Sequence, residues 1–145
     1  MKLVLLPIHI SFVGIWLGCV LTKALFERAL HGKAREQAHT LVALHKRVDV
    51  VVEIPVFTVV LITGFMMYPF ASLSGLIHIK IALGLLAVAV NAYCVWLVFR
   101  RASAAQAGHR EEFARLDHKQ HQYGALVLLS IVAALGVGVY VSVST

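Results

Sequence analysis

The sequence predicts an all-α integral membrane protein, a single bundle of four transmembrane helices spanning residues 1–145. Three observations predict this fold class. The chain is 60% hydrophobic and only 14% charged, whereas soluble domains are about 45–50% apolar and about 25% charged. It contains four apolar segments of the roughly 20 residues that a helix needs to cross a bilayer. Its basic residues gather in two of the three connections between these segments, which is typical of membrane topology.

The four apolar segments are residues 3–26, 48–70, 76–99 and 123–143. Residues 27–46 are polar but rich in helix-forming Ala, Leu, Glu, Arg and Gln, so we expect them to extend the flanking helices as an αα-hairpin. Residues 71–75 form a tight connection led in by Pro69. Residues 100–122 form a second polar and basic connection. No alternation typical of β-strands is present, so the chain is expected to be helical throughout.

Lysine and arginine counts predict the orientation. The first connection and its flanks hold Lys23, Arg28, Lys33, Arg35, Lys46 and Arg47, and the third holds Arg100, Arg101, Arg110, Arg115 and Lys119. Only Lys2 and Lys80 lie toward the other side. By the positive-inside rule, the first and third connections are cytoplasmic and both termini are outside.

The net charge of +6 does not indicate nucleic-acid binding, because the basic residues flank apolar segments rather than forming a phosphate-binding face. Cys19 and Cys94 lie inside apolar segments and are expected to be packed thiols rather than a disulfide. The apolar segment after Lys2 is long enough to span, so we expect it to be a membrane helix rather than a cleaved signal peptide.

Polar side chains in or near the predicted spans are the candidate functional residues, because burying them in hydrocarbon is costly. They are His9 in the first span; His45, Asp49 and Glu53 at the inner part of the second; His78, Lys80 and Asn91 in the third; and His118 and His121 at the inner start of the fourth. Two facing histidines can supply both axial ligands of a haem, and the core of a helix bundle commonly holds such cofactors.

The histidines sort into an outer and an inner set. An outer haem b can use His9 with His78, and an inner one His45 with His121 or His118. Stacked haems would carry electrons across the membrane. The alternative is that His45, His78, His118 and His121 are interfacial residues whose polar ends reach water. Zinc or copper ligation by the inner histidines lacks a supporting thiolate or methionine cluster, and Met66-Met67 is expected to pack.

His45, Asp49 and Glu53 are spaced at four-residue steps and therefore share one helix face, with Pro55 expected to bend the helix after them. A carboxylate there can orient a ligand histidine, relay a proton, or pair with Arg47 or Lys119. Pairing is the expectation for Asp49. Glu53 lies more than one helical turn beyond His45, which favours a proton-handling or quinone-site role. Lys80 can reach outward to water or sit beside a porphyrin propionate.

Several short motifs resemble the HemJ-type protoporphyrinogen oxidases and the wider CopD-type copper-resistance membrane proteins. They are Ile8-His9-Ile10 with Trp16, residues 61–64 (Leu-Ile-Thr-Gly), and residues 75–83 (Gly-Leu-Ile-His-Ile-Lys-Ile-Ala-Leu) continuing to Tyr93-Cys94. The resemblance covers the first three spans. It implies a four-helix protein of the bacterial inner membrane that binds haem b, with the functional histidine and lysine at His9 and Lys80.

This chain departs from that family at three places. Residues 21–26 (Leu-Thr-Lys-Ala-Leu-Phe) replace a Leu-Pro-Arg-Leu-Phe run, and Asn91 stands where the family often has histidine. Residues 116–122 (Leu-Asp-His-Lys-Gln-His-Gln) replace an Asn-Glu-Ile-Pro element. The departures point to a relative of the family with a different inner site.

Three hypotheses about function remain open. The first is a haem b protein that transfers electrons, to or from quinone or a redox partner subunit. The second is an enzyme that oxidises protoporphyrinogen IX, with Lys80 and Glu53 as catalytic candidates. The third is a non-redox or copper-handling membrane subunit. The lipid bilayer is the surrounding partner in each, and a homo-oligomer is compatible with all of them.

Overall fold

The computed structural model describes residues 2–30, 35–68 and 75–144, and every element within them is helical. The elements are α1 (Lys2–Leu30), α2 (Arg35–Val48), a π-helical turn η1 (Asp49–Glu53), α3 (Ile54–Met66), α4 (Gly75–Ala107) and α5 (Arg110–Ser144). The segments α2, η1 and α3 follow one another without a break, so together they make one long rod. The predicted all-α fold is confirmed.

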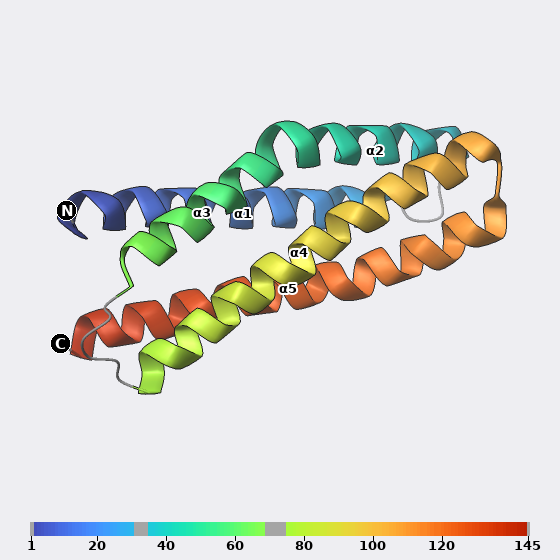
Figure 1. Ribbon diagram of the computed structural model, residues 1–145. Coiled ribbons are helices and arrows are strands. Elements are labelled where there is room, and N and C mark those ends of the chain that lie inside the picture. Colours follow the sequence, from blue (N-terminus) through green and yellow to red (C-terminus); the bar gives the residue numbers. More distant parts are fainter. Residues whose placement is uncertain (1, 31–34, 69–74, 145) are drawn as a thin grey trace.

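The four rods lie side by side, with both termini at one end of the bundle (Figure 1). That end, where α3 ends and α4 begins, is called the terminus end. The opposite end, where α1 ends, α2 begins and α4 turns into α5, is called the loop end. Each rod is long and apolar enough to cross a membrane. The described protein is therefore a multi-pass membrane bundle.

The helices extend well past the apolar segments that predicted them. Residues 27–30 and 35–47 are helical, and most of the predicted connection 100–122 belongs to α4 and α5. A helix of 33 residues, the length of α4, measures about 50 Å, whereas the hydrocarbon core is about 30 Å thick. The loop end therefore projects beyond the apolar layer. Pro69 and residues 71–74, the predicted tight connection, lie outside the described residues.

The turn between α4 and α5 needs only two residues. Gly108 has a φ of +74°, a left-handed conformation that glycine adopts without steric cost. Its N–H donates to the Ala105 carbonyl at 3.3 Å, and the His109 N–H donates to the Ala104 carbonyl at 3.0 Å. These two bonds make the Schellman pattern that ends helices. The antiparallel pair of α4 and α5 starts from this turn.

The π-helical turn η1 directly precedes Pro55 in the second rod. Proline lacks an N–H and its ring crowds the carbonyl four residues earlier, so an α-helix cannot continue regularly through it. A wider turn relieves this conflict, and single π turns are often found at functional sites. Figure 1 shows the rod changing direction between α2 and α3. The expected bend is present, and it falls on the turn that carries Asp49 and Glu53.

The bundle has an apolar core and an apolar outer surface. Trp16, Val60, Ala87 and Val127 belong to one buried cluster, and the Trp16 ring lies 6.1 Å from the Phe57 ring. Many large hydrophobic side chains, such as Leu129, are exposed. In water such a surface would be unfavourable, whereas in a bilayer the exposed apolar side chains contact lipid.

Candidate functional site

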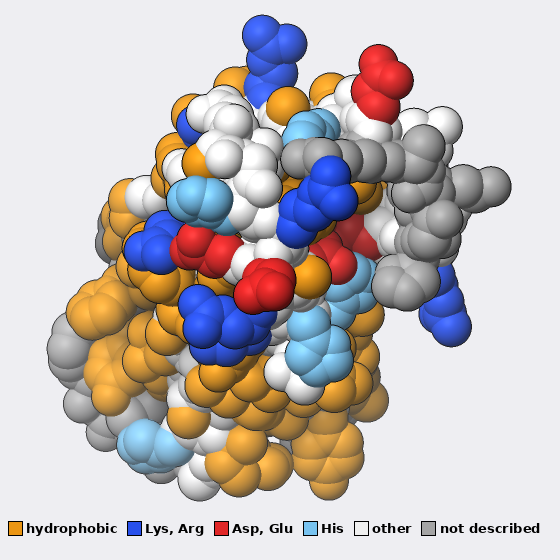
Figure 2. Space-filling view, turned by 90° about the vertical axis from the view of Figure 1, so that its right-hand side faces the viewer, with side chains coloured by type: hydrophobic (Ala, Val, Ile, Leu, Met, Phe, Trp, Pro, Cys, Tyr) orange, Lys and Arg blue, Asp and Glu red, His pale blue; other side chains and the backbone are white. Residues whose placement is uncertain are grey.

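The loop end gathers most of the charged and histidine side chains of the bundle (Figure 2). Beneath the surface, five elements meet in an ionic cluster that is buried at its centre and partly exposed at its rim, where Asp117 and His121 lie. Its members are Lys23 and Glu27 from α1, His45 from α2, Asp49 and Glu53 from η1, Arg101 from α4, and Asp117 and His121 from α5. This loop-end cluster is the densest polar site among the described residues.

Glu27 is the centre of one half of the cluster. Its carboxylate lies 3.2 Å from His45 Nδ1, accepts a hydrogen bond from Arg101 at 3.0 Å, and lies 3.4 Å from His121 Nε2. Arg101 extends a second nitrogen to Asp117 at 2.8 Å. One carboxylate thus links α1 to α2, α4 and α5, which fixes the four rods relative to one another at this end.

Lys23 is the centre of the other half. Its ammonium donates to Asp49 at 2.7 Å and also to Glu53. The four-residue spacing of His45, Asp49 and Glu53 does place all three on one buried face, turned toward α1. Asp49 is paired as expected, but its partner is Lys23 rather than Arg47 or Lys119.

Several atoms in and near the cluster are buried without a hydrogen-bond partner. They are His45 Nε2, Asp49 Oδ2, Glu53 Oε1, Arg101 Nε and Gln120 Oε1, and further along the bundle Asn91 Nδ2 and Trp16 Nε1. An unpaired polar atom is costly in a low-dielectric interior. Such positions are where a ligand, a water molecule or an additional proton would be stabilised most.

The terminus end has a sparser polar site around His9. The Nδ1 atom of His9 is 2.8 Å from the Thr63 hydroxyl, and that hydroxyl donates to the Val59 carbonyl at 2.7 Å. Gly64 lies against the ring, since a Cβ there would be 3.4 Å from His9 Cε1. Lys80 is close enough to His9 for an electrostatic interaction. The structure thus brings together His9 and Lys80, which came from separate sequence motifs.

The remaining candidates are distributed over both ends. His78 is exposed in the first turn of α4, near the terminus end. Asn91 is buried in the middle of α4. His118 is exposed on α5 and contacts Gln122 at 3.1 Å, so it points away from the cluster that His121 joins. His121 also uses its Nδ1 atom, 3.0 Å from the Asp117 carbonyl.

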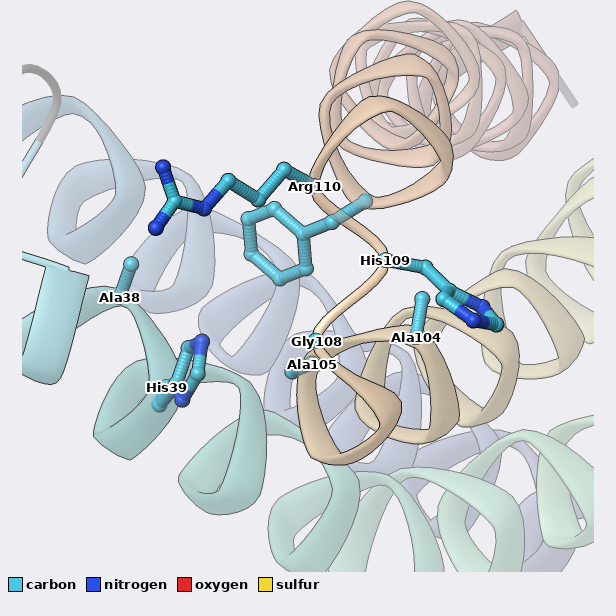
Figure 3. A pocket seen from close by; sticks show the side chains of 8 residues that line it. Ala38, His39, Ala104, Ala105, Gly108, His109 and Arg110 are labelled. Carbon is cyan, nitrogen blue, oxygen red and sulfur yellow. The ribbon is translucent and has the colours of Figure 1, made fainter.

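Two hollows lie near the loop end. A groove of about 960 Å³ runs between α1 and α2, and Cys19, Lys23 and His45 are among its lining residues. A smaller cavity of about 260 Å³ lies beside the α4/α5 turn. Figure 3 shows His39 facing this turn from α2, with Gly108 across the cavity. Only the groove touches the ionic cluster.

Three site residues were not predicted from the sequence: Lys23, Glu27 and Arg101. Lys23 and Arg101 served there only as basic residues that indicate membrane orientation. The apolar segment ends at Phe26, so Glu27 fell in a predicted connection. A signal was present, because Lys23 and Glu27 are four residues apart with no glycine or proline between them or in the next turn. That spacing places both on one face of a continuing helix.

Comparison of the chain with family models, with curated proteins and with solved structures gave no match. Within residues 2–30, 35–68 and 75–144, no group of three or more His, Cys, Asp or Glu side chains is arranged to hold a metal ion. The geometry of the two polar sites is therefore the basis for inferring function.

Proposed function

We propose that this chain is a haem b-binding protein of the bacterial inner membrane that takes part in electron transfer, with His9 as an axial ligand near the terminus end. The observation that carries the proposal is the hydrogen bond between His9 and Thr63. It is supported by the resemblance of the surrounding motifs to a haem-binding family.

The Thr63 hydroxyl has one hydrogen, and it is donated to the backbone of its own helix. With its hydrogen on the backbone, the hydroxyl oxygen accepts from His9; in that tautomer Nδ1 carries the ring proton and Nε2 keeps its lone pair. Ligating histidines commonly hold their second nitrogen in this way, which fixes the tautomer and the ring orientation. His9 thus has the hydrogen-bonding state that an iron ligand needs.

The surroundings of His9 suit a porphyrin. The ring is half-buried between apolar helices, and Gly64 removes the side chain that would crowd it. The Lys80 ammonium interacts electrostatically with His9 and would supply the counter-charge for a propionate. His78, on the same end of α4, is the candidate for the opposite axial position. Haem b would supply reversible one-electron chemistry here, while the chain supplies the ligand, the counter-charge and the exclusion of water.

The inner site supports a haem less well. His45 Nε2 is buried without a partner while Nδ1 faces Glu27, which is the arrangement of a ligating histidine. His121, however, has both ring nitrogens occupied, by Glu27 and by the Asp117 carbonyl. An inner haem would have to displace the Glu27 contacts that join the four rods. We therefore propose one haem rather than two.

The test is haem content after purification in detergent from cells grown with excess haem precursor. We expect a b-type reduced-minus-oxidised spectrum from the unaltered protein and loss of most haem in His9→Ala, because alanine offers no ligand. His109→Ala, which alters an exposed histidine at the loop end, is the control and should keep all its haem. Full haem content in His9→Ala would exclude His9, and an unaltered protein without haem would leave a non-redox or copper-handling role.

Protoporphyrinogen IX oxidation is the second candidate, favoured by the proximity of Lys80 to His9. The resemblance implies that the functional histidine and lysine of such enzymes correspond to His9 and Lys80. Expression of this chain in cells that lack protoporphyrinogen oxidase tests it. Growth that depends on both Lys80 and His9 would favour the enzyme, whereas no growth despite bound haem would favour electron transfer alone.

A further inference from the structure

The Lys23, Asp49 and Glu53 side chains form a buried group whose charges do not balance. Both carboxylates are 0% exposed, and the Lys23 side chain is 14% exposed. The Lys23 ammonium is the cation that the structure places on both carboxylates. One positive charge therefore faces two negative charges in the interior of a membrane protein, where an uncompensated charge is strongly disfavoured.

The neighbouring groups do not supply the missing positive charge. Arg101, the most deeply buried cation among the described residues, is bound to Glu27 and Asp117. His45 faces Glu27 as well. The thiols of Cys19 from α1 and Cys94 from α4 also interact electrostatically with these carboxylates, but a thiol adds no positive charge. The excess negative charge therefore stays on Asp49 and Glu53.

Each carboxylate also has one oxygen without a partner. Lys23 binds Asp49 Oδ1 and Glu53 Oε2, while Asp49 Oδ2 and Glu53 Oε1 are buried and unpaired. The two carboxyl groups lie within hydrogen-bonding reach of each other. Two ionised carboxylates at that separation repel, whereas a carboxylic acid donating to a carboxylate is stabilised. One added proton balances the charge and turns one of the two carboxylates into a hydrogen-bond donor.

We propose that Asp49 and Glu53 share one proton beside Lys23, which makes this pair a proton-binding site inside the membrane protein. The π-helical turn η1 carries both carboxylates and directs both of them at α1. Lys23 also lines the open groove between α1 and α2, so the groove gives protons a route from the surroundings to the pair. This site does not depend on whether the protein binds haem.

Infrared spectroscopy of the purified full chain tests the proposal, because a protonated carboxyl has a C=O stretching band that a carboxylate lacks. At about pH 6 an ordinary Asp or Glu is ionised. We expect one protonated carboxyl per chain at that pH, with a band that shifts in D₂O. Glu53→Gln and Asp49→Asn should each abolish the band, because the remaining carboxylate is then matched one-to-one by Lys23.

Glu111→Gln is the matched control, since Glu111 is exposed at the start of α5, and its band should equal that of the unaltered protein. Circular dichroism establishes that each variant stays helical. A band that survives either Glu53→Gln or Asp49→Asn would overturn the shared proton. The absence of any such band from the unaltered protein would overturn it too, and that measurement needs no variant.

Discussion

The two ends of the bundle place polar side chains in opposite ways. At the loop end, two sets of ion pairs, centred on Lys23 and on Glu27, join five elements, and Glu27 alone contacts the three other rods. At the terminus end, His9 is held by a hydrogen bond to Thr63 and an interaction with the Val60 backbone, and Lys80 packs against Gly138 of α5.

This difference separates the structural from the ligand-binding tasks of the two ends. In the loop-end network, buried charges pair with opposite charges, so removing one member leaves an uncompensated charge on its partner. A polar group held on one side only keeps bonding capacity for something from outside the chain. We therefore assign the arrangement of the rods to the loop end, apart from the proposed proton-binding pair, and the proposed cofactor site to the terminus end.

The two ends of the bundle should face opposite sides of the membrane, and a test of their orientation has an all-or-none outcome. The loop end holds nearly all the Lys and Arg, so we expect it in the cytoplasm. A reporter that works only in the periplasm should be active when fused to the C-terminus and inactive when inserted at Gly108. A cytoplasmic reporter should give the reverse pattern, and cytoplasmic activity at the C-terminus would invert the orientation.

Arg101→Met should be the most destabilising single change in the loop-end network. It leaves Glu27 and Asp117 without their shared cation, and breaking a buried ion pair costs about 3–5 kcal/mol. Arg100→Met is the neighbouring control. Arg100 is 51% exposed and pairs with Glu112 at the surface, where such pairs contribute about 0–1 kcal/mol. Unfolding in detergent measures the loss of stability in each variant. Similar losses in Arg101→Met and Arg100→Met would contradict a stabilising role for the buried network.

The sequence was sufficient for the four spans but not for the network, and particular residues show why. Hydropathy detects where a helix meets lipid, so it ended the first span at Phe26. The helix itself continues to Leu30 because nothing in the next turn breaks it. Glu27 is therefore a buried helical residue, although its neighbours in sequence are polar.

The sequence also did not reveal which residues pair with the buried polar side chains. The His45, Asp49 and Glu53 face followed from four-residue spacing, but which helix it meets depends on how the rods pack. Lys23 reaches Asp49 across 26 positions and Arg101 reaches Glu27 across 74. No local pattern encodes such contacts. The π-helical turn before Pro55 rotates the carboxylates as well, and only the bend was predictable from the proline.

Thr63→Val should weaken haem binding without unfolding the bundle, if the terminus end holds the cofactor. Valine keeps the shape of threonine but cannot accept a hydrogen bond from His9, so nothing fixes the tautomer of the ring. Loss of such a supporting bond typically costs about 10–100-fold in metal affinity. Thr58→Val is the control on the same helix, because the exposed Thr58 hydroxyl bonds only its own backbone. Equal haem affinities of the two variants would remove Thr63 from the site.

The smallest expected effect concerns how firmly Lys80 is held at the terminus end. Glycine in a helix costs roughly 0.5–1 kcal/mol relative to alanine, so Gly136→Ala, with no atom within 4 Å of the new Cβ, should raise stability by about that amount. Gly138→Ala should gain less, because its Cβ would lie 3.2 Å from Lys80 Cε and 3.3 Å from Nζ. The lysine end must then move.

A double-mutant cycle separates this contact from the helix itself. In a Lys80→Ala background the obstacle is gone, so Gly138→Ala and Gly136→Ala should raise the unfolding midpoint equally. If the two glycine substitutions already give equal gains with Lys80 present, the lysine swings aside without cost. Lys80 would then not be positioned by α5, and the counter-charge assigned to it beside His9 would lose its structural basis.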